Sequence, residues 1–200
     1  LLDEFALRTT GLFSFSTRDD QYSKQTPTGD LEILRSFYLD RGYIQFKIES
    51  TQVAITPNKQ DIYITVVIDE GPVFSINDIK LAGDLVVPAE EMFPLIDLRR
   101  GEPFSRKRVN ESTERITDLL SNQGYAFANI NSIPAVDEDS REVGLTFFVD
   151  PGKRVYVRRI NTLGNTRTRD EVLRREMRQM EAGWFSSGQL NNSRDRLRRL

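Results

Sequence analysis

The side chains of this sequence that could do chemistry are carboxylates and guanidinium groups, because the chain contains no cysteine and no histidine. Their absence removes thiolate nucleophiles, imidazole bases, disulfides and nearly all zinc sites. Asp137, Glu138 and Asp139 could in principle bind calcium or act as an acid/base pair. No glycine or distant carboxylate completes a calcium loop there, so a hairpin turn is the favoured interpretation. Glu90 and Glu91 lie in the first turn of an expected helix, where carboxylates favour the helix dipole.

A second charged group is a run of arginines that could form a phosphate-binding patch: Arg167, Arg169, Arg174, Arg175 and Arg178. Acidic residues are interleaved with them at spacings that suit ion pairs within one helix, namely Asp170, Glu171, Glu176 and Glu181. The pattern therefore favours a solvated helix face. No catalytic residue, metal site or cofactor is expected from either charged group.

The totals describe an ordinary globular chain of 200 residues, with 38% hydrophobic and 29% charged residues. A net charge of −2 gives no electrostatic reason to expect nucleic acid as a partner. No run of residues approaches the roughly 18 apolar residues of a membrane-spanning helix. The chain starts without methionine and reads as a fragment, so we expect any export signal or membrane part to lie outside it.

The chain contains an internal repeat, which shows where its domains meet. Residues 145–165 align without a gap on residues 64–84, 81 positions earlier, and the turn glycines coincide: Gly152 with Gly71, and Gly164 with Gly83. Each copy has an apolar strand, an Asp-x-Gly turn and a second short strand. Gly42-Tyr43 and Gly124-Tyr125 repeat in the same way after helical patterns. A period near 80 residues suits small tandem domains better than a solenoid.

Only the second unit is complete, and its elements follow the order β-α-α-β-β. We expect a strand over residues 73–81, a short helix over 88–98, a helix from Ser105 to Gly124, and a hairpin of strands 126–136 and 142–150. The helix stripe is Val109, Ile116, Leu119 and Leu120. Pro134 has no amide donor and predicts that its strand lies at a sheet edge.

The first unit lacks its first strand. We expect a short helix over residues 1–8 and a loop to residue 28 anchored by Phe13 and Phe15. A helix capped by Asp30 follows, with Leu31, Leu34, Phe37 and Tyr38 on one face and Gly42 at its end. A strand from Ile44 changes phase before Val53 and Ile55, which predicts a β-bulge or a change of buried face near residues 49–52, and a strand over 62–68 closes the hairpin.

The third unit lacks its last two strands. It should have a strand from Lys153, a helix from Thr168 with an inward face, and a second helix. The inward residues of the first helix are Val172, Leu173, Met177 and Met180, and the second carries Leu190, Leu197 and Leu200. The predicted fold class is α+β, with domains over residues 1–71, 72–152 and 153–200. Each complete domain has a three-stranded mixed sheet covered on one face by two helices, so its edges are open to strands from other chains.

The element order, the period, the Tyr-x-x-x-Gly-Tyr motif of residues 38–43 and above all the run VLRREMRQME of residues 172–181 resemble the POTRA domains of bacterial outer-membrane β-barrel assembly factors. The resemblance covers the whole chain and implies a truncated third domain, a whole fourth domain and the first half of a fifth. One departure is Ala182, because the family more often has glycine directly after the glutamate at this point.

The resemblance implies a non-enzymatic scaffold arm on the periplasmic side of the outer membrane, joined to the membrane only through a barrel outside this chain. It implies binding of lipoprotein subunits and unfolded outer-membrane proteins by edge-strand addition. Val53 and Ile55 match the edge strand that meets the propeller lipoprotein subunit, whereas periodicity alone favours ordinary core packing for both. Glu181, with Arg174 and Arg175, matches the region that meets the helical-repeat lipoprotein subunit.

Two alternatives stay open at the level of sequence. One is an oligosaccharide- or nucleotide-processing enzyme with an α/β domain, although the lack of histidine, cysteine and a glycine-rich phosphate loop counts against it. The other is the POTRA arm of a related translocation or secretion protein, such as a two-partner translocator.

Overall fold

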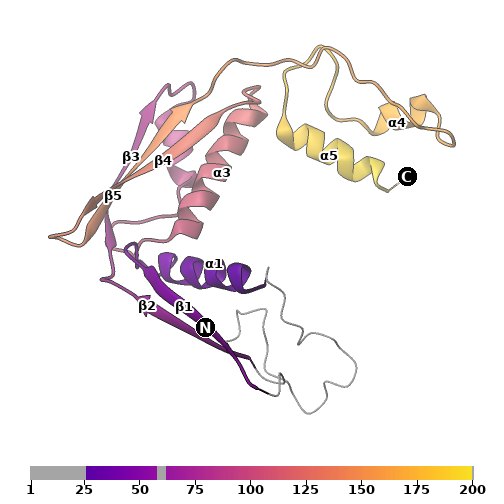
Figure 1. Ribbon diagram of the computed structural model, residues 1–200. Helices are drawn as coiled ribbons and strands as arrows, with labels where there is room; N and C mark the ends of the chain where they lie inside the picture. Colours follow the sequence, from indigo (N-terminus) through magenta and orange to yellow (C-terminus); the bar gives the residue numbers. More distant parts are fainter. Residues whose placement is uncertain (1–25, 58–61, 200) are drawn as a thin grey trace. The chain divides into compact units, whose positions relative to one another are not determined.

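The computed structural model describes residues 26–57 and 62–199 (Figure 1). They belong to two compact units, which we describe separately. The first comprises Leu1–Asn77, Arg99–Arg108 and Val136–Val143, and the second Asp78–Leu98, Val109–Ala135 and Gly144–Leu200. The expectations for residues 1–8, Phe13, Phe15 and Leu200 lie outside the described residues.

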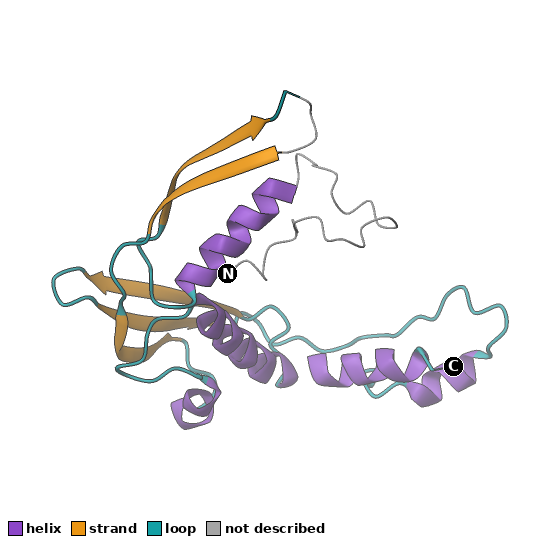
Figure 2. Cartoon of the chain, turned by 90° about the horizontal axis from the view of Figure 1, so that it is seen from below, coloured by secondary structure: helices purple, strands orange, loops and turns teal. Residues whose placement is uncertain are grey.

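In the first unit, helix α1 (Thr26–Leu39) packs along a hairpin of β1 (Lys47–Ile55) and β2 (Ile62–Asp69), as Figures 1 and 2 show. The core consists of Leu34, Tyr38 and Phe46, flanked by apolar residues of both strands. The predicted cap at Asp30 is wrong. The helix begins four residues earlier, so Asp30 lies in its second turn, where it is only 4% exposed.

Helix α1 ends at Leu39, and the turn that follows it closes at the predicted Gly42, which adopts a left-handed φ of +94°. The amide of Tyr43 donates to the carbonyl of Tyr38 at 3.2 Å, a bond that closes the last turn. The strand expected from Ile44 starts only at Lys47, because the amides of Ile44 and Phe46 donate to nearby turn carbonyls instead of to a ladder. The predicted bulge is confirmed, since the antiparallel register of β1 and β2 shifts between Ile48 and Ser50.

Tyr38 ties the helix to the end of the hairpin. Its hydroxyl donates to Oε1 of Glu70 at 2.7 Å, and its ring stacks on Phe46 with centroids 4.3 Å apart. The hydrogen bond to the Glu70 carboxylate, with burial and the negative charge of that group, raises the pKa of Tyr38 to about 12. The buried tyrosine is therefore neutral and satisfied.

The three-stranded sheet has the order β3-β5-β4, formed by β3 (Ser75–Gly83), β5 (Glu142–Asp150) and β4 (Asn129–Asp137). The amide of Ser75 donates to the carbonyl of Arg141, and that of Asp84 donates to the carbonyl of Val149. Strands β3 and β5 therefore run parallel, and with the hairpin of β4 and β5 the sheet is mixed. The predicted edge position of Pro134 is confirmed, because β4 is an outer strand.

Helices cover one face of this sheet, as predicted. Alternate residues of β5 are buried, namely Val143, Leu145, Phe147 and Val149, and α3 (Arg106–Asn122) lies along the sheet (Figure 1). Of its predicted stripe, Val109, Ile116 and Leu120 are buried and Leu119 is half-buried. The helix expected over residues 88–98 is shorter, with α2 (Ala89–Met92) followed by the 3-10 turn η3 (Phe93–Leu95), because Pro94 has no amide to continue an α-helix.

The last part of the second unit departs most from expectation. The strand predicted from Lys153 forms only an isolated bridge, between Tyr156 and Trp184, since no strand corresponding to β5 pairs with it among the described residues. The helices here are α4 (Asp170–Glu176) and α5 (Ser187–Leu197). Met180 was predicted to face inward, but it lies beyond the end of α4 and is 66% exposed.

Candidate functional site

The hairpin of the first unit carries an exposed apolar strip, defined here as Val53, Ile55 and Ile64. Val53 pairs with Ile64, which shares its face of β2 with the core-packed Val66. The exposed fractions are 43% for Val53, 60% for Ile55 and 37% for Ile64. Periodicity therefore identified the correct face of the strand, but the strip continues that face beyond the core instead of filling it.

Unpaired backbone lies beside the strip. Within residues 26–57 and 62–199, β1 pairs only with β2. The outer edge of β1 therefore presents amide and carbonyl groups next to exposed apolar side chains. This arrangement has the properties needed to add a strand from another chain, with the strip supplying side-chain contacts.

A second candidate site centres on Arg174 of α4. Its guanidinium donates to Oδ2 of Asp170 at 2.6 Å, to Oε1 of Glu181 at 3.2 Å and to the carbonyl of Ile160 at 3.1 Å. Glu181 also accepts the Ile160 amide at 2.8 Å, and the Thr162 hydroxyl donates to Asp170. The structure thus brings Arg174 and Glu181 together in one network, which we call the guanidinium cluster.

The charges of the cluster stabilise one another. The pKa of Glu181 is lowered, first by the Ile160 amide and then by Arg174. The pKa of Asp170 is lowered by the Thr162 hydroxyl and by Arg174, whose own pKa is raised by Asp170 and Glu181. All three groups are therefore ionised at neutral pH, and the carboxylates hold Arg174 in place.

The other arginine named from the sequence, Arg175, lies outside this cluster. Its guanidinium is 3.8 Å from Glu176, and its side chain is 76% exposed. Glu176 also pairs with Arg196 of α5 at 2.5 Å. The ion pair of Asp170 and Arg174 at i, i+4 confirms the prediction of ion pairs within the helix. This pairing explains the position of Arg174 better than a phosphate-binding patch does.

Sequence reasoning missed Ile64, Ile160 and Thr162. The pairing of Val53 with Ile64 depends on hairpin register, which the bulge shifts by one residue. The roles of Ile160 and Thr162 depend on contacts 21 and 8 residues away, for which the sequence has no periodic signal. Asp170, in contrast, was indicated by its i, i+4 spacing to Arg174.

The loop that positions Glu181 follows the same path as the loop of the preceding repeat. Ala182 has a left-handed φ of +57°, and Gly101, 81 positions earlier, has a φ of +82°. The amides of both donate to backbone carbonyls at 2.7 Å, that of Ala182 to Val157 and that of Gly101 to Ile76. The departure noted at Ala182 therefore leaves the loop path unchanged and places a Cβ where glycine is preferred.

Ala182→Gly is expected to raise the free energy of unfolding of this region by about 0.5–1 kcal/mol, which is the left-handed penalty less the larger entropy loss of glycine. Trp184, the only tryptophan, lies two residues away and reports urea unfolding by fluorescence. Ala182→Val is the matched control and should lower stability, because a β-branched residue fits this conformation poorly. If the glycine variant is no more stable than the unaltered chain, the left-handed conformation of Ala182 does not destabilise the loop.

The acidic group at residues 137–139 is the predicted hairpin turn. Oδ1 of Asp137 accepts the amides of Asp139 and Ser140 at 3.0 and 3.3 Å, and the turn ends at Arg141 with a φ of +56°. Among the described residues, no set of three or more acidic side chains is placed to hold a metal ion. Nor does any helix in residues 26–57 and 62–199 have the length and hydropathy to cross a membrane.

An apolar groove of about 330 Å³ lies at α5, lined by Met177, Leu190, Ser193, Arg194, Leu197 and Arg198. Its apolar residues Met177, Leu190 and Leu197 lie 81 positions after Ile96, Val109 and Ile116. Those three are buried core residues of the preceding repeat. Ser193 accepts the amide of Arg178 as Ser112 accepts that of Asp97. The groove therefore has the lining of the preceding repeat's core and not that of a ligand site.

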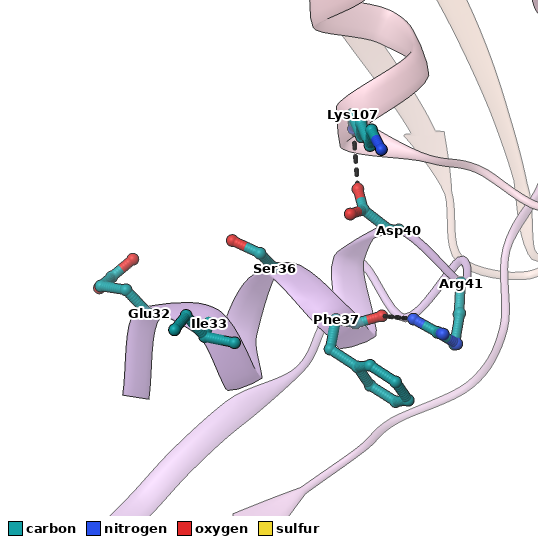
Figure 3. Close-up of a pocket in the computed structure, with 7 residues that line it drawn as sticks. All are labelled: Glu32, Ile33, Ser36, Phe37, Asp40, Arg41 and Lys107. Carbon is teal, nitrogen blue, oxygen red and sulfur yellow. Dashed lines mark hydrogen bonds between the residues drawn. The ribbon is translucent and has the colours of Figure 1, made fainter. Parts of the chain in front are cut away.

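A wider pocket of about 690 Å³ lies along α1 and is lined by Glu32, Ile33, Ser36, Phe37, Asp40, Arg41 and Lys107 (Figure 3). Arg41 lies over the ring of Phe37, 3.4 Å from its centroid, and donates to the carbonyl of the same residue. Asp40 accepts the backbone amide of Lys107 at 2.7 Å. The polar side chains of this pocket are spread along the helix and do not converge on a point where a reacting atom could sit.

Known proteins are similar to this chain in sequence. The curated "Outer membrane protein assembly factor BamA" of Neisseria meningitidis is 29% identical over 201 residues, covering 100% of this chain and 25% of that protein. Its counterpart in Buchnera aphidicola is 32% identical over 166 residues, covering 83% of this chain and 27% of that protein. The chain spans about a quarter of the length of these relatives.

Solved structures agree with the sequence comparison. The crystal structure of Haemophilus influenzae BamA POTRA3-5 matches with a TM-score of 0.79 at 30% identity, covering 90% of this chain and 71% of that one. BamA of Haemophilus ducreyi lacking POTRA domains 1-3 matches with a TM-score of 0.58 at 33% identity, covering 63% and 24%. The family model "POTRA: Surface antigen variable number repeat" matches residues 1–71, 74–152 and 155–200. Since these matches cover nearly the whole chain, it belongs to the POTRA family.

Proposed function

We propose that this chain is a periplasmic arm of the outer-membrane β-barrel assembly machinery. In this role it binds lipoprotein subunits and nascent outer-membrane proteins. The bound outer-membrane proteins are then folded and inserted into the membrane. Support comes from the tandem POTRA matches and from relatives named as outer-membrane assembly factors. The predicted domains over residues 1–71, 72–152 and 153–200 are the modules of this arm.

The observation that carries the proposal is the exposed apolar strip beside the outer edge of β1, which pairs with no further strand in the described part of the chain. A strand added there gains main-chain hydrogen bonds with little side-chain selectivity, which suits a factor that accepts many substrates. We assign this edge to nascent chains and to a BamB-like propeller lipoprotein. The guanidinium cluster, with Glu181 on the exposed loop and Arg175 nearby, is assigned to a BamD-like lipoprotein. The proposal gives the chain no catalytic step.

Val53→Asp is expected to weaken binding of the purified propeller lipoprotein by about tenfold or more, because an unpaired carboxylate would be buried at the interface. The melting temperature followed by circular dichroism should hardly change, because Val53 is 43% exposed. Gln52→Asp is the matched control, since Gln52 lies on the opposite face of the same strand. Unchanged affinity, or a collapsed melt, would count against the strip as a binding surface, and Ile55→Asp repeats the test.

Glu181→Lys is expected to weaken binding of the helical-repeat lipoprotein through charge reversal at the interface. The change also removes an acceptor of Arg174, so a control must separate the two effects. Asp170→Asn loosens Arg174 and leaves the Glu181 carboxylate in place, so in a pull-down titration it should weaken binding much less than Glu181→Lys does. If the lysine variant binds as well as the unaltered chain, or if Asp170→Asn weakens binding equally, Glu181 is not a contact.

A further inference from the structure

A helix cap crosses the boundary between the first two repeats. The carboxylate of Asp40, just after the last residue of α1, accepts the backbone amide of Lys107 at the start of α3 (2.7 Å; Figure 3). Two residues on, the carbonyl of Gly42 accepts the amide of Phe74 at 2.8 Å. We call these four residues the first joint.

The same two bonds recur in the second unit, 81 or 82 positions later. Oδ1 of Asn122, the last residue of α3, accepts the amide of Gly188 at the start of α5 at 2.8 Å. The carbonyl of Gly124 accepts the amide of Val155 at 2.8 Å. These four residues form the second joint, in which an asparagine takes the place of the aspartate.

Each capped helix already has a cap of its own. The hydroxyl of Ser105 accepts the amide of Arg108, and that of Ser186 accepts the amide of Gln189. The first turn of a helix has several amides without partners inside the helix. In both cases the local serine satisfies the amide at the third position, and the residue from the preceding repeat satisfies the amide at the second. The N-terminal turn is therefore complete only when both repeats are in place.

The glycine of each joint allows the first residues of the next repeat to approach its backbone. A Cβ at Gly42 would lie 2.9 Å from the Phe74 carbonyl oxygen, and one at Gly124 would lie 2.9 Å from the side chain of Arg154. Arg154 in turn donates to the carbonyl of Gln123 at 2.7 Å. The glycine also follows the end of the helix, so one short motif closes a helix, accepts a backbone amide of the next repeat and caps that repeat's helix.

We infer that Asp40 and Asn122 are positioning residues that hold successive repeats in a fixed relation and couple the stability of each capped helix to the repeat before it. The requirement is an acceptor oxygen at that point, which both aspartate and asparagine supply. The recurrence of the bond with two different residue types supports this reading. An arm joined in this way transmits a displacement from one repeat to the next instead of absorbing it at a flexible linker.

The test compares variants of the 200-residue chain that remove or keep the acceptor. Asp40→Ala is expected to speed amide hydrogen exchange in residues 106–110 by about fivefold, the usual effect of losing a helix cap. It should also broaden the distance distribution between spin labels introduced at Arg35 and Asp139. Asp40→Asn should change neither measurement. The chain has no cysteine, so labels at introduced cysteines are specific.

The second joint supplies an independent replicate. Asn122→Ala should speed exchange in residues 187–191 and broaden the distribution between labels at Glu114 and Asn191, while Asn122→Asp should not. Ser105→Ala is the matched control for a cap within one repeat, and it should speed exchange at Arg108 without broadening the distances. Alanine variants with unchanged exchange and distances, or Asp40→Asn behaving like Asp40→Ala, would overturn the inference. An alanine variant that fails to fold while the asparagine variant keeps narrow distances supports it.

Discussion

Phe147→Ala is expected to lower the free energy of unfolding of the second unit by about 3–5 kcal/mol. Phe147 lies in the middle of β5, the central strand of the three-stranded sheet, and none of its surface is exposed. Truncation removes the transfer free energy of the ring and leaves a cavity that close-packed neighbours fill poorly. Urea titration followed by far-ultraviolet circular dichroism measures the loss.

The adjacent residue provides the control. Phe148 has the same side chain on the same strand, but it points to the other face and is 46% exposed. Phe148→Ala should change the free energy of unfolding by less than about 1 kcal/mol. Equal losses for the two variants would mean that both faces of the sheet are covered, which would also undermine the proposed open architecture.

Gly83→Ala is expected to lower the free energy of unfolding by about 3 kcal/mol or more, because two penalties add. Gly83 has a φ of +94°, and a Cβ there would lie 2.2 Å from the carbonyl oxygen of Val149. That oxygen accepts the amide of Asp84 at 3.0 Å, so relief of the clash separates the ends of β3 and β5. A thermal melt followed by circular dichroism detects the loss.

Gly101→Ala separates the two penalties. Its φ is +82°, and no atom lies within 4 Å of where its Cβ would be. It should therefore lose only the left-handed penalty less the larger entropy loss of glycine on folding, about 0.5–1 kcal/mol. If both alanine variants lose the same amount, the approach of Val149 contributes nothing and the backbone conformation alone explains why glycine is needed.

Local chemistry accounts for what the sequence predicted correctly. The bulge after Ile48, the edge position of Pro134 and the turn at Asp137 each follow from side-chain alternation, a missing amide donor or an Asx-type bond. The order β-α-α-β-β emerged from the repeat, because two copies constrain each other's boundaries. The partner-binding roles of Val53, Ile55, Arg174, Arg175 and Glu181 stay predictions.

The errors arose where a distant partner decides the outcome. Asp30 is a good capping residue, but α1 extends past it toward Thr26 and packs it inside. The segment after Lys153 has a strand's pattern, yet a strand exists only where a ladder partner pairs with it. Met180 fits a helical face, but α4 ends at Glu176 before reaching it. The guanidinium cluster was only partly foreseen, because two of its bonds go to backbone atoms of Ile160.

The proline in β4 has a consequence for how the open edges compare. Within a sheet, proline is tolerated where its nitrogen faces away from the neighbouring strand, so the missing donor of Pro134 lies on the solvent side. A peptide that pairs with the outer edge of β4 would meet a row of backbone amide donors with one missing at Pro134. Strand β1 contains no proline, so its row of amide donors is complete. Of the two strands compared, β1 is thus the better host, and an incoming segment free to pair with either β1 or β4 should add to the first hairpin.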